Sequence, residues 1–168
     1  MRWIEVDSPD GRLGLFASDR GLCAVATSKK ENAAYKKGAL PANFLAPDKA
    51  ESHLVTARDW LSRYFLGENP GTIPALDFSG QGEFSTKVLK ELTRVPWGEA
   101  TTYGELAKRV GQPGASRAVG GAVHRNPLWP FVACHRVLAA GGKIGGFAGG
   151  LAAKRRLLKL ENIPIPKP

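Results

Sequence analysis

The residues best suited to chemistry in this 168-residue chain are Cys134 and its neighbour His135. A cysteine attacks as the thiolate, and nearby cations or an adjacent base favour that form. Side chains of consecutive residues diverge on a helix or a strand, so we expect His135 to reach the thiol through one water molecule. Glu161 is the natural residue to orient the imidazole, because no other carboxylate lies nearby in the sequence. The pattern predicts a nucleophilic Cys134–His135–Glu161 site, the alternative being a buried structural cysteine beside an incidental histidine.

The second cysteine, Cys23, lies in the apolar run 22–25 and is typical of a small core residue. Two cysteines are too few for a disulfide framework or for a zinc site built mainly from thiolates, so we expect no metal. No window approaches the ~20 apolar residues that a membrane-spanning helix needs, and the first residues lack the apolar stretch of a signal peptide. We therefore expect no membrane partner and a cytoplasmic protein, or a nuclear one in a eukaryote.

The net charge of +9 is concentrated in the second half of the chain. Residues 1–76 contain 10 basic and 9 acidic side chains, whereas residues 77–168 contain 14 and 6. Positions 106–160 hold ten Lys or Arg and no acid. Such a local surplus suits a polyanion, most simply a nucleic acid, although a solvated basic face would have the same composition.

Hydrophobic periodicity predicts the elements that must position these residues. Strands are expected over 3–6, 13–16 and 22–25, followed by a loop or weak structure over 28–47. A helix is expected over 48–66, where Asp48 and Glu51 have the spacing of a capping box. The Pro- and Gly-containing connection 67–82 suggests two subdomains, 1–76 and 77–168. We expect an α+β fold with a strand-rich N-terminal part and a helical C-terminal part.

Two short helices are expected within the basic half, over 103–110 and 116–124, after a third over 83–95. Thr102 is a candidate cap for the first, and the Gly-containing turn between them is typical of a helix-turn-helix. The second helix offers small residues where a base-reading helix carries long polar ones. Small residues allow close approach either to the minor groove or to a neighbouring helix, and the charge favours DNA contact of low sequence specificity. Arg117 would then be free to insert into the base stack. The small residues of this helix are Ala118, Gly120, Gly121 and Ala122.

A glycine-rich segment, 141–150, follows the cysteine and precedes a last helix expected over 151–162. It lacks the Gly-Lys-Ser/Thr ending of a phosphate-binding loop. The segment is better suited to line a binding site in which its backbone packs closely against a flat ligand.

Ordered motifs from about Phe78 to Glu161 resemble the alkylguanine-DNA alkyltransferases. The resemblance implies an RNase-H-like N-terminal subdomain and a C-terminal subdomain that contains the helix-turn-helix and the acceptor cysteine. The matching runs are Pro-Trp-Gly-Glu at 96–99, Thr-Tyr-Gly-Glu-Leu-Ala at 102–107, Ser-Arg-Ala-Val-Gly-Gly-Ala at 116–122, Asn-Pro at 126–127, Cys-His-Arg-Val at 134–137 and Gly-Gly-Phe-Ala-Gly-Gly-Leu at 145–151.

The family's residue roles transfer to the matching positions. The resemblance implies that Cys134 accepts the alkyl group, His135 is its water-relayed base and Glu161 orients His135. Asn126 corresponds to the hinge residue beside the active-site turn. The resemblance also implies the substrate contacts. Tyr103 would donate to a guanine ring nitrogen, the carbonyls of Cys134 and Val137 would accept from the exocyclic amine, and the Ala148 amide would face the oxygen. Phe147 would pack against the base as an aromatic wall, and Gly149 would also line the substrate site. DNA contacts are implied for Thr102, Arg117, Ala118, Gly120, Gly121 and Ala122.

The implied activity is DNA repair by one irreversible alkyl transfer per protein molecule, from O6-alkylguanine and also from O4-alkylthymine. The implied partner is duplex DNA from which the damaged nucleotide is flipped through the minor groove. No cofactor is needed, and a monomer is expected in the absence of DNA. The chain has Ala133 where the family usually has Pro, and Phe147 where it usually has Tyr.

Three other functions compete with this hypothesis. A non-catalytic alkyltransferase-like sensor would bind the same DNA, but such relatives replace the nucleophile that Cys134 retains. A thiol hydrolase would use the same triad, but it also needs an oxyanion hole and turns over repeatedly. A transcriptional regulator would use the helix-turn-helix, and the small second helix argues against such sequence readout.

Overall fold

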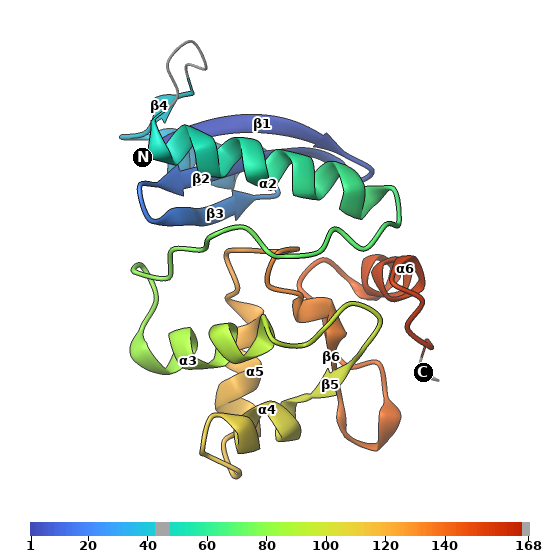
Figure 1. Cartoon of the computed structure of the whole chain (residues 1–168). Helices are drawn as coiled ribbons and strands as arrows, with labels where there is room; N and C mark the ends of the chain where they lie inside the picture. The colour runs from blue at the N-terminus through green and yellow to red at the C-terminus, as the bar shows by residue number, and fades with distance from the viewer. Residues whose placement is uncertain (43–47, 166–168) are drawn as a thin grey trace. The chain divides into compact units, whose positions relative to one another are not determined.

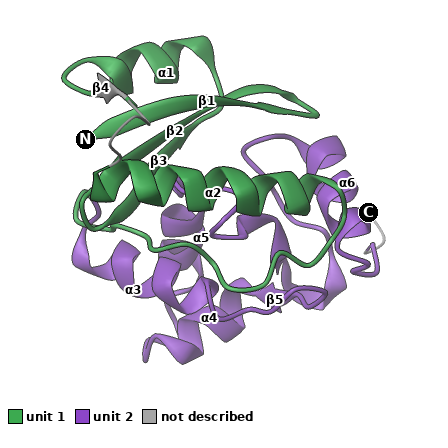
Figure 2. Ribbon diagram, turned by 45° about the horizontal axis from the view of Figure 1, so that its top comes forward, with its two compact units in different colours: residues 1–80 green, residues 81–168 purple. Residues whose placement is uncertain are grey.

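The computed structural model describes residues 1–42 and 48–165 and divides the chain into two compact units, residues 1–80 and 81–168 (Figure 2). The first unit is built on a sheet and the second mostly from helices (Figure 1). The α+β prediction is therefore confirmed. No helix in the described ranges is both long and apolar enough to cross a membrane.

The sheet of the first unit has the strand order β3-β2-β1-β4. Its strands are β1 (Arg2–Ser8), β2 (Gly11–Ser18), β3 (Gly21–Ala26) and the short β4 (Leu40–Pro41). The first three are antiparallel neighbours, and β4 pairs in parallel with β1. The tight turn into β2 requires Gly11, whose φ of 113° is reached most readily by a residue without a side chain.

Helices cover both faces of this sheet (Figure 2). Phe16 and Ala24 are paired across β2 and β3, and the ring of Tyr35 from α1 (Lys29–Lys36) packs on Phe16 at 5.2 Å. Leu15 and its partner on β3 face the opposite way. That side packs against α2 (Lys49–Phe65), whose buried apolar side chains are Ala50, Leu54, Ala57, Trp60, Leu61 and Tyr64.

The expected helix caps occur, whereas one helix was not predicted. Asp48 and Glu51 form the capping box at the start of α2. Segment 28–47 was expected to be a loop or weak structure, but it contains α1, because the Ser28 side chain accepts a hydrogen bond from the Glu31 amide and caps the helix. Residues 43–47 of that segment lie outside the described residues.

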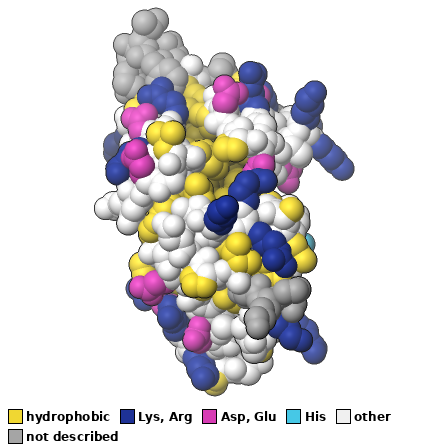
Figure 3. Space-filling model, turned by 90° about the vertical axis from the view of Figure 1, so that its right-hand side faces the viewer, with side chains coloured by type: hydrophobic (Ala, Val, Ile, Leu, Met, Phe, Trp, Pro, Cys, Tyr) yellow, Lys and Arg dark blue, Asp and Glu magenta, His cyan; other side chains and the backbone are white. Residues whose placement is uncertain are grey.

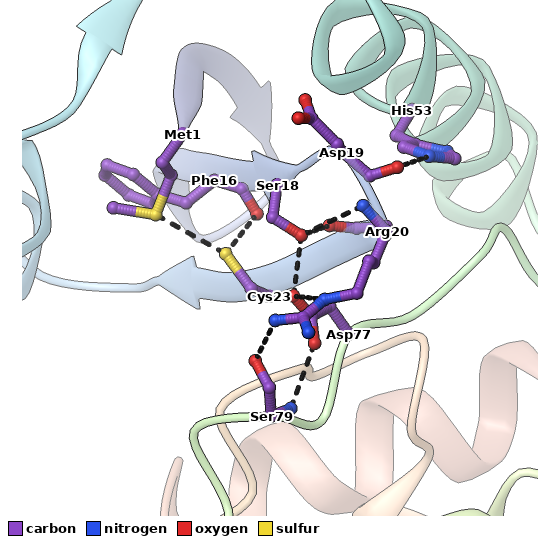
Figure 4. Close-up of polar contacts among 10 residues, drawn as sticks. Met1, Phe16, Ser18, Asp19, Arg20, Cys23, His53, Asp77 and Ser79 are labelled. Carbon is purple, nitrogen blue, oxygen red and sulfur yellow. Dashed lines mark hydrogen bonds and ion pairs between the residues drawn. The ribbon is translucent and has the colours of Figure 1, made fainter.

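The first unit ends at Gly80, four residues beyond the boundary expected from the sequence. Leu22 of β3 bonds to the backbone of Ala75 and Asp77, at 2.8 Å each, which ties this segment to the sheet. Asp77 also accepts hydrogen bonds from Ser18 at 2.6 Å and Arg20 at 3.2 Å (Figure 4). Burial alone would raise the pKa of Asp77, but these bonds and that of the Ser79 amide lower it to about 2.

The second cysteine belongs to this unit and is half-buried at the edge of the sheet. The Cys23 thiol lies 3.3 Å from the Phe16 carbonyl oxygen and 3.5 Å from the Met1 sulfur (Figure 4). Burial raises the pKa of this thiol. Cys23 packs against the apolar cluster formed by Phe16, Ala24 and Ala26, as expected for a core residue.

The second unit is a group of helices joined by irregular segments. Its helices are α3 (Glu83–Leu92), α4 (Tyr103–Arg109), α5 (Ser116–His124) and α6 (Leu151–Leu160), with the 3₁₀ turns η1 (Cys134–Arg136) and η2 (Ala140–Gly142). Two short strands, β5 (Thr101–Thr102) and β6 (Val137–Leu138), pair in parallel. Helices α3, α4 and α5 pack on one another through Val88, Leu89, Leu92, Leu106, Ala107, Val119 and Ala122.

The start of α4 is fixed by a capping box in which Thr102 and Glu105 exchange hydrogen bonds. The prediction that Thr102 caps this helix is confirmed. Beneath α6, Leu158 joins Ile144 and Ile163 in a second apolar cluster, against which Leu138 of β6 packs. This cluster holds α6 beside the strand that follows the cysteine.

Candidate active site

Cys134 begins a 3₁₀ turn that follows a tight bend of the chain. The Cys134 amide bonds to the Val132 carbonyl at 2.9 Å, and Ala133 has φ −79° and ψ 69°. These values are those of an inverse γ-turn centred on Ala133. The Val137 amide then bonds back to the Cys134 carbonyl at the end of η1. Two successive turns thus hold Cys134, which is partly exposed, at a defined place on the surface of the unit.

The next residue after the cysteine, His135, forms a buried pair with Glu161. The His135 Nε2 atom lies 2.7 Å from a Glu161 carboxylate oxygen, and both side chains are fully buried. Because an ionised carboxylate only accepts hydrogen bonds, Nε2 carries the proton. Nδ1 is therefore the acceptor nitrogen of the neutral ring. The structure brings these two residues together, as the sequence predicted.

Arg136 is a third member of this buried group that the sequence analysis did not assign. Its Nε atom donates to the second oxygen of Glu161 at 2.6 Å, and its Nη1 atom donates to the Val95 carbonyl at 2.6 Å. Glu161 therefore bonds to His135 with one oxygen and to Arg136 with the other. The sequence contained one indication of this ion pair. Glu161 is the only acid after Glu105, so it was the only carboxylate in that part of the sequence that could pair with Arg136 if the arginine was buried.

The protonation states of this group follow from its contacts. Burial would raise the pKa of Glu161, but the hydrogen bonds to His135 and Arg136 lower it to about 2. Burial lowers the pKa of His135, and Arg136 adds to that effect, against the opposing influence of Glu161. At neutral pH the carboxylate is ionised and the imidazole is neutral. A neutral imidazole whose Nε2–H donates to Glu161 carries no proton on Nδ1, and Nδ1 can therefore accept one.

Asn126 braces the loop that leads to the cysteine. Its amide nitrogen donates to the Val132 carbonyl at 2.7 Å, and its amide oxygen accepts from the Leu128 amide at 3.0 Å. Burial raises the pKa of the Cys134 thiol, while hydrogen bonds with the Asn126 side chain and the local backbone oppose that rise. Asn126 thus ties the start of this loop to the residue two positions before the cysteine.

Tyr103, at the first turn of α4, lies within electrostatic reach of the cysteine. Burial raises the pKa of its hydroxyl, and the negative charge of a Cys134 thiolate raises it further. The ring packs beside Gly120 of α5, where an added Cβ would lie 3.8 Å from the ring. Tyr103 therefore remains a protonated donor near the sulfur at neutral pH.

The other residues expected to contact a substrate follow the cysteine in sequence. Val137 is buried in β6, while Phe147 is half-buried and Ala148 and Gly149 are exposed. The Phe147 ring covers Gly149 so closely that a Cβ at Gly149 would come within 2.8 Å of it. A glycine is thus needed at position 149 for the aromatic side chain to lie where it does.

Five of the six residues expected to contact DNA are exposed or half-buried. Arg117 and Ala118 are exposed, and Thr102, Gly120 and Gly121 are half-buried. Ala122, by contrast, is 1% exposed and lies in the core between the helices, because its position on α5 faces inward. We therefore omit Ala122 from the candidate DNA-binding surface. Lys and Arg side chains are also visible on the face that carries α6 (Figure 3).

In residues 1–42 and 48–165, no three His, Cys, Asp or Glu side chains gather in a way that would hold a metal ion. The buried histidine and carboxylate bond to each other instead, and the carboxylate also accepts a hydrogen bond from Arg136. These side chains form a hydrogen-bonded proton-accepting group beside a thiol. That arrangement is typical of proteins in which a buried His–Glu pair activates a cysteine nucleophile.

Comparison with known families specifies the class. Residues 83–163 match the family described as 6-O-methylguanine DNA methyltransferase, DNA binding domain. Residues 1–79 match its ribonuclease-like domain. The chain belongs to the methylated-DNA–protein-cysteine methyltransferases, an enzyme family of DNA repair.

Relatives and solved structures agree with this assignment. The methylated-DNA–protein-cysteine methyltransferase of Methanosarcina acetivorans is 41% identical over 161 residues, which cover 96% of this chain and 98% of that protein. The human protein of the same name is 35% identical over 100% of this chain and 84% of its own length. The Mycobacterium bovis protein is 46% identical, and the alignment covers 66% of each chain.

Among solved structures, the chain resembles Mycobacterium tuberculosis OGT in complex with DNA, with a TM-score of 0.78 and 36% identity over 99% of this chain and 96% of that one. The O6-methylguanine-DNA methyltransferase of Pyrococcus kodakaraensis is similar at a TM-score of 0.59 and 28% identity, over 96% of this chain and 99% of that one.

Proposed function

We propose that this protein repairs duplex DNA by transferring the alkyl group of O6-alkylguanine, and also of O4-alkylthymine, to Cys134. The transfer is irreversible and occurs once per molecule, because the thioether that forms has no easy route back to a thiol. The observation that carries the proposal is the fully buried His135–Glu161 pair, 2.7 Å apart, whose histidine is the chain neighbour of the partly exposed Cys134.

The proposed reaction balances without a cofactor. One water molecule carries the thiol proton of Cys134 to Nδ1 of His135, and Glu161 stabilises the imidazolium. The thiolate attacks the alkyl carbon, so that an S–C bond forms and the C–O6 bond breaks, with its electron pair passing to the guanine. The Tyr103 hydroxyl donates its proton to the guanine ring nitrogen, which makes neutral guanine the leaving group. The tyrosinate then takes a proton from water, and the imidazolium of His135 releases one to water, so that the thiol proton is balanced by the proton gained by guanine.

The segments around the thiol hold the base. The carbonyls of Cys134 and Val137 accept hydrogen bonds from the exocyclic amine, and the Ala148 amide faces the oxygen. Phe147 forms an aromatic wall over the base, and Gly149 lets that ring approach the backbone. A purine with an amine at position 2 is therefore the base that this site fits best.

The base reaches the thiol by leaving the double helix. Helices α4 and α5 act as a helix-turn-helix in the minor groove, where the small side chain of Ala118 and the backbone of Gly121 allow close approach. Arg117, exposed at the start of α5, fills the gap that the flipped nucleotide leaves. Unstacking the nucleotide costs a few kcal/mol, which the phosphate and groove contacts offset. The similarity to a relative solved in complex with DNA supports this arrangement. Free of DNA, the protein is a monomer.

Single-turnover kinetics test the proposal. Purified protein is mixed with a tenfold excess of duplex DNA that carries one O6-methylguanine, and restored guanine is counted over time. We expect one guanine restored per protein molecule, followed by a plateau. Cys134→Ser should abolish the reaction, while Cys23→Ser, the matched control, should restore as much guanine as the native protein.

Two results would contradict the proposal. Continued turnover beyond one equivalent would indicate a hydrolase that uses the same residues. Full activity in Cys134→Ser would assign the acceptor to another residue.

A further inference from the structure

One lysine of the second unit is buried completely. Lys154 lies in the first half of α6 with 0% of its surface exposed, whereas Arg155 is half-buried and Arg156 is exposed. Lysine side chains normally keep the ammonium group in water, because removing it from water is costly. A lysine that is buried despite this cost must have compensating contacts.

The contacts of the Lys154 ammonium are backbone carbonyls on two segments. Its Nζ atom donates to the Val137 carbonyl at 2.6 Å and to the Gly146 carbonyl at 3.2 Å. Val137 belongs to β6, and Gly146 lies in the glycine-rich segment 141–150. Short bonds from a charged donor are stronger than neutral ones. Lys154 therefore joins α6, the strand after the cysteine and the glycine-rich segment.

The glycine-rich segment also folds back on Ala139, the residue that follows β6. The Ala139 amide bonds to the Lys143 carbonyl at 2.9 Å, and a Cβ at Gly145 would lie 3.2 Å from the Ala139 nitrogen. Gly145 also has a φ of +69°, which disfavours any side chain there. Close backbone packing and the lysine thus together set the distance between this segment and Val137.

We propose that Lys154 is a positioning residue that orients the Val137 carbonyl and thereby sets the preference for purines with an amine at position 2. This inference rests on the proposed function, in which that carbonyl accepts a hydrogen bond from the guanine amine. A carbonyl oxygen has two lone pairs. Lys154 occupies one of them, which leaves the other directed at the substrate.

The test compares two bases that differ only in the amine. Repair rates are measured on duplexes that carry O6-methylguanine or O6-methylhypoxanthine, which lacks the amine at position 2. The native protein should prefer the guanine. Lys154→Met, which keeps the length and apolar stem, should lower the ratio of the two rates about three- to tenfold, the effect of losing one well-directed hydrogen bond. Lys159→Met, an exposed lysine of the same helix, is the control and should keep the native ratio.

A second variant guards against a folding defect. Lys154→Arg keeps the charge but lengthens the side chain, so it should displace the Val137 carbonyl and lower the same ratio. If only one variant yields folded protein by circular dichroism, the ratio in that variant decides the question.

A purely electrostatic role would give a different pattern. The charge of Lys154 favours the Cys134 thiolate, so its loss would slow both substrates equally and shift the pH profile of alkylation of Cys134 by iodoacetamide. Equal slowing with an unchanged ratio would overturn the positioning role. If the native protein fails to react with O6-methylguanine at all, the proposed function itself is wrong.

Discussion

Replacing Glu161 by Gln removes the charge on which the buried group of the active site depends. The pKa of Glu161 is about 2 in the folded protein against 4.5 for an ordinary glutamate. A difference of that size corresponds to about 3 kcal/mol of folding free energy at pH 7. An independent estimate of the same interactions is similar, because leaving Arg136 as a buried cation without its carboxylate typically costs about 3–5 kcal/mol. We therefore expect the free energy of unfolding to fall by about 3 kcal/mol.

The pH dependence of this loss distinguishes a charge effect from a packing effect. Because the folded pKa is depressed, the stabilisation is complete above pH 4.5 and disappears as the pH falls toward 2. The advantage of the native protein over Glu161→Gln should shrink by about 0.8 kcal/mol between pH 7 and pH 4, and by about 2 kcal/mol at pH 3. Urea unfolding followed by tryptophan fluorescence at each pH measures both proteins.

The matched control is Glu99→Gln, which changes an exposed carboxylate of the same unit. It should alter stability by less than about 0.5 kcal/mol at every pH. A cost for Glu161→Gln that stays constant from pH 7 to pH 3, or one no larger than that of the control, would refute the account of the buried group.

Three further changes have defined outcomes. Arg117→Ala should slow repair of duplex DNA much more than reaction with a free O6-alkylguanine base, and equal losses in the two rate assays would make Arg117 structural. Ala133→Pro should stabilise the protein by about 0.4–1 kcal/mol in urea unfolding, since the φ of −79° suits proline; a lower urea midpoint would contradict this. Asp77→Asn should lower the free energy of unfolding by about 1–2 kcal/mol at pH 7, because Asp77 accepts hydrogen bonds from Ser18 and Arg20. A thermal denaturation midpoint equal to that of the native protein would show that these bonds contribute nothing.

The sequence predicted the start of a helix well where neighbouring side chains form its cap. The capping boxes begun by Asp48 and Thr102 involve residues three apart, so they can be read directly from the sequence. The helix α1 has a cap of the same kind at Ser28 but a mostly polar sequence, and its apolar contact is made mainly by Tyr35. Helices without an apolar stripe are hard to recognise from periodicity.

Long-range contacts account for most of what the sequence did not predict. The end of the first unit depends on backbone bonds between Leu22 and residues 75–77, more than fifty positions apart. Arg136 was counted as one of several basic residues, although Glu161 needed a partner for its second oxygen. Lys154 lies three and four positions before Leu157 and Leu158, on the buried face of α6, and that spacing was the signal for its burial.

In the proposed reaction, Cys134 itself receives the alkyl group. The most direct measurement uses duplex DNA in which the methyl group of O6-methylguanine carries three deuterium atoms, followed by peptide mass spectrometry of the protein and analysis of the solution for labelled methanol. We expect one labelled methyl group per protein molecule, located on the peptide that contains Cys134, and no labelled methanol. Label on another residue, or release of labelled methanol, would contradict it.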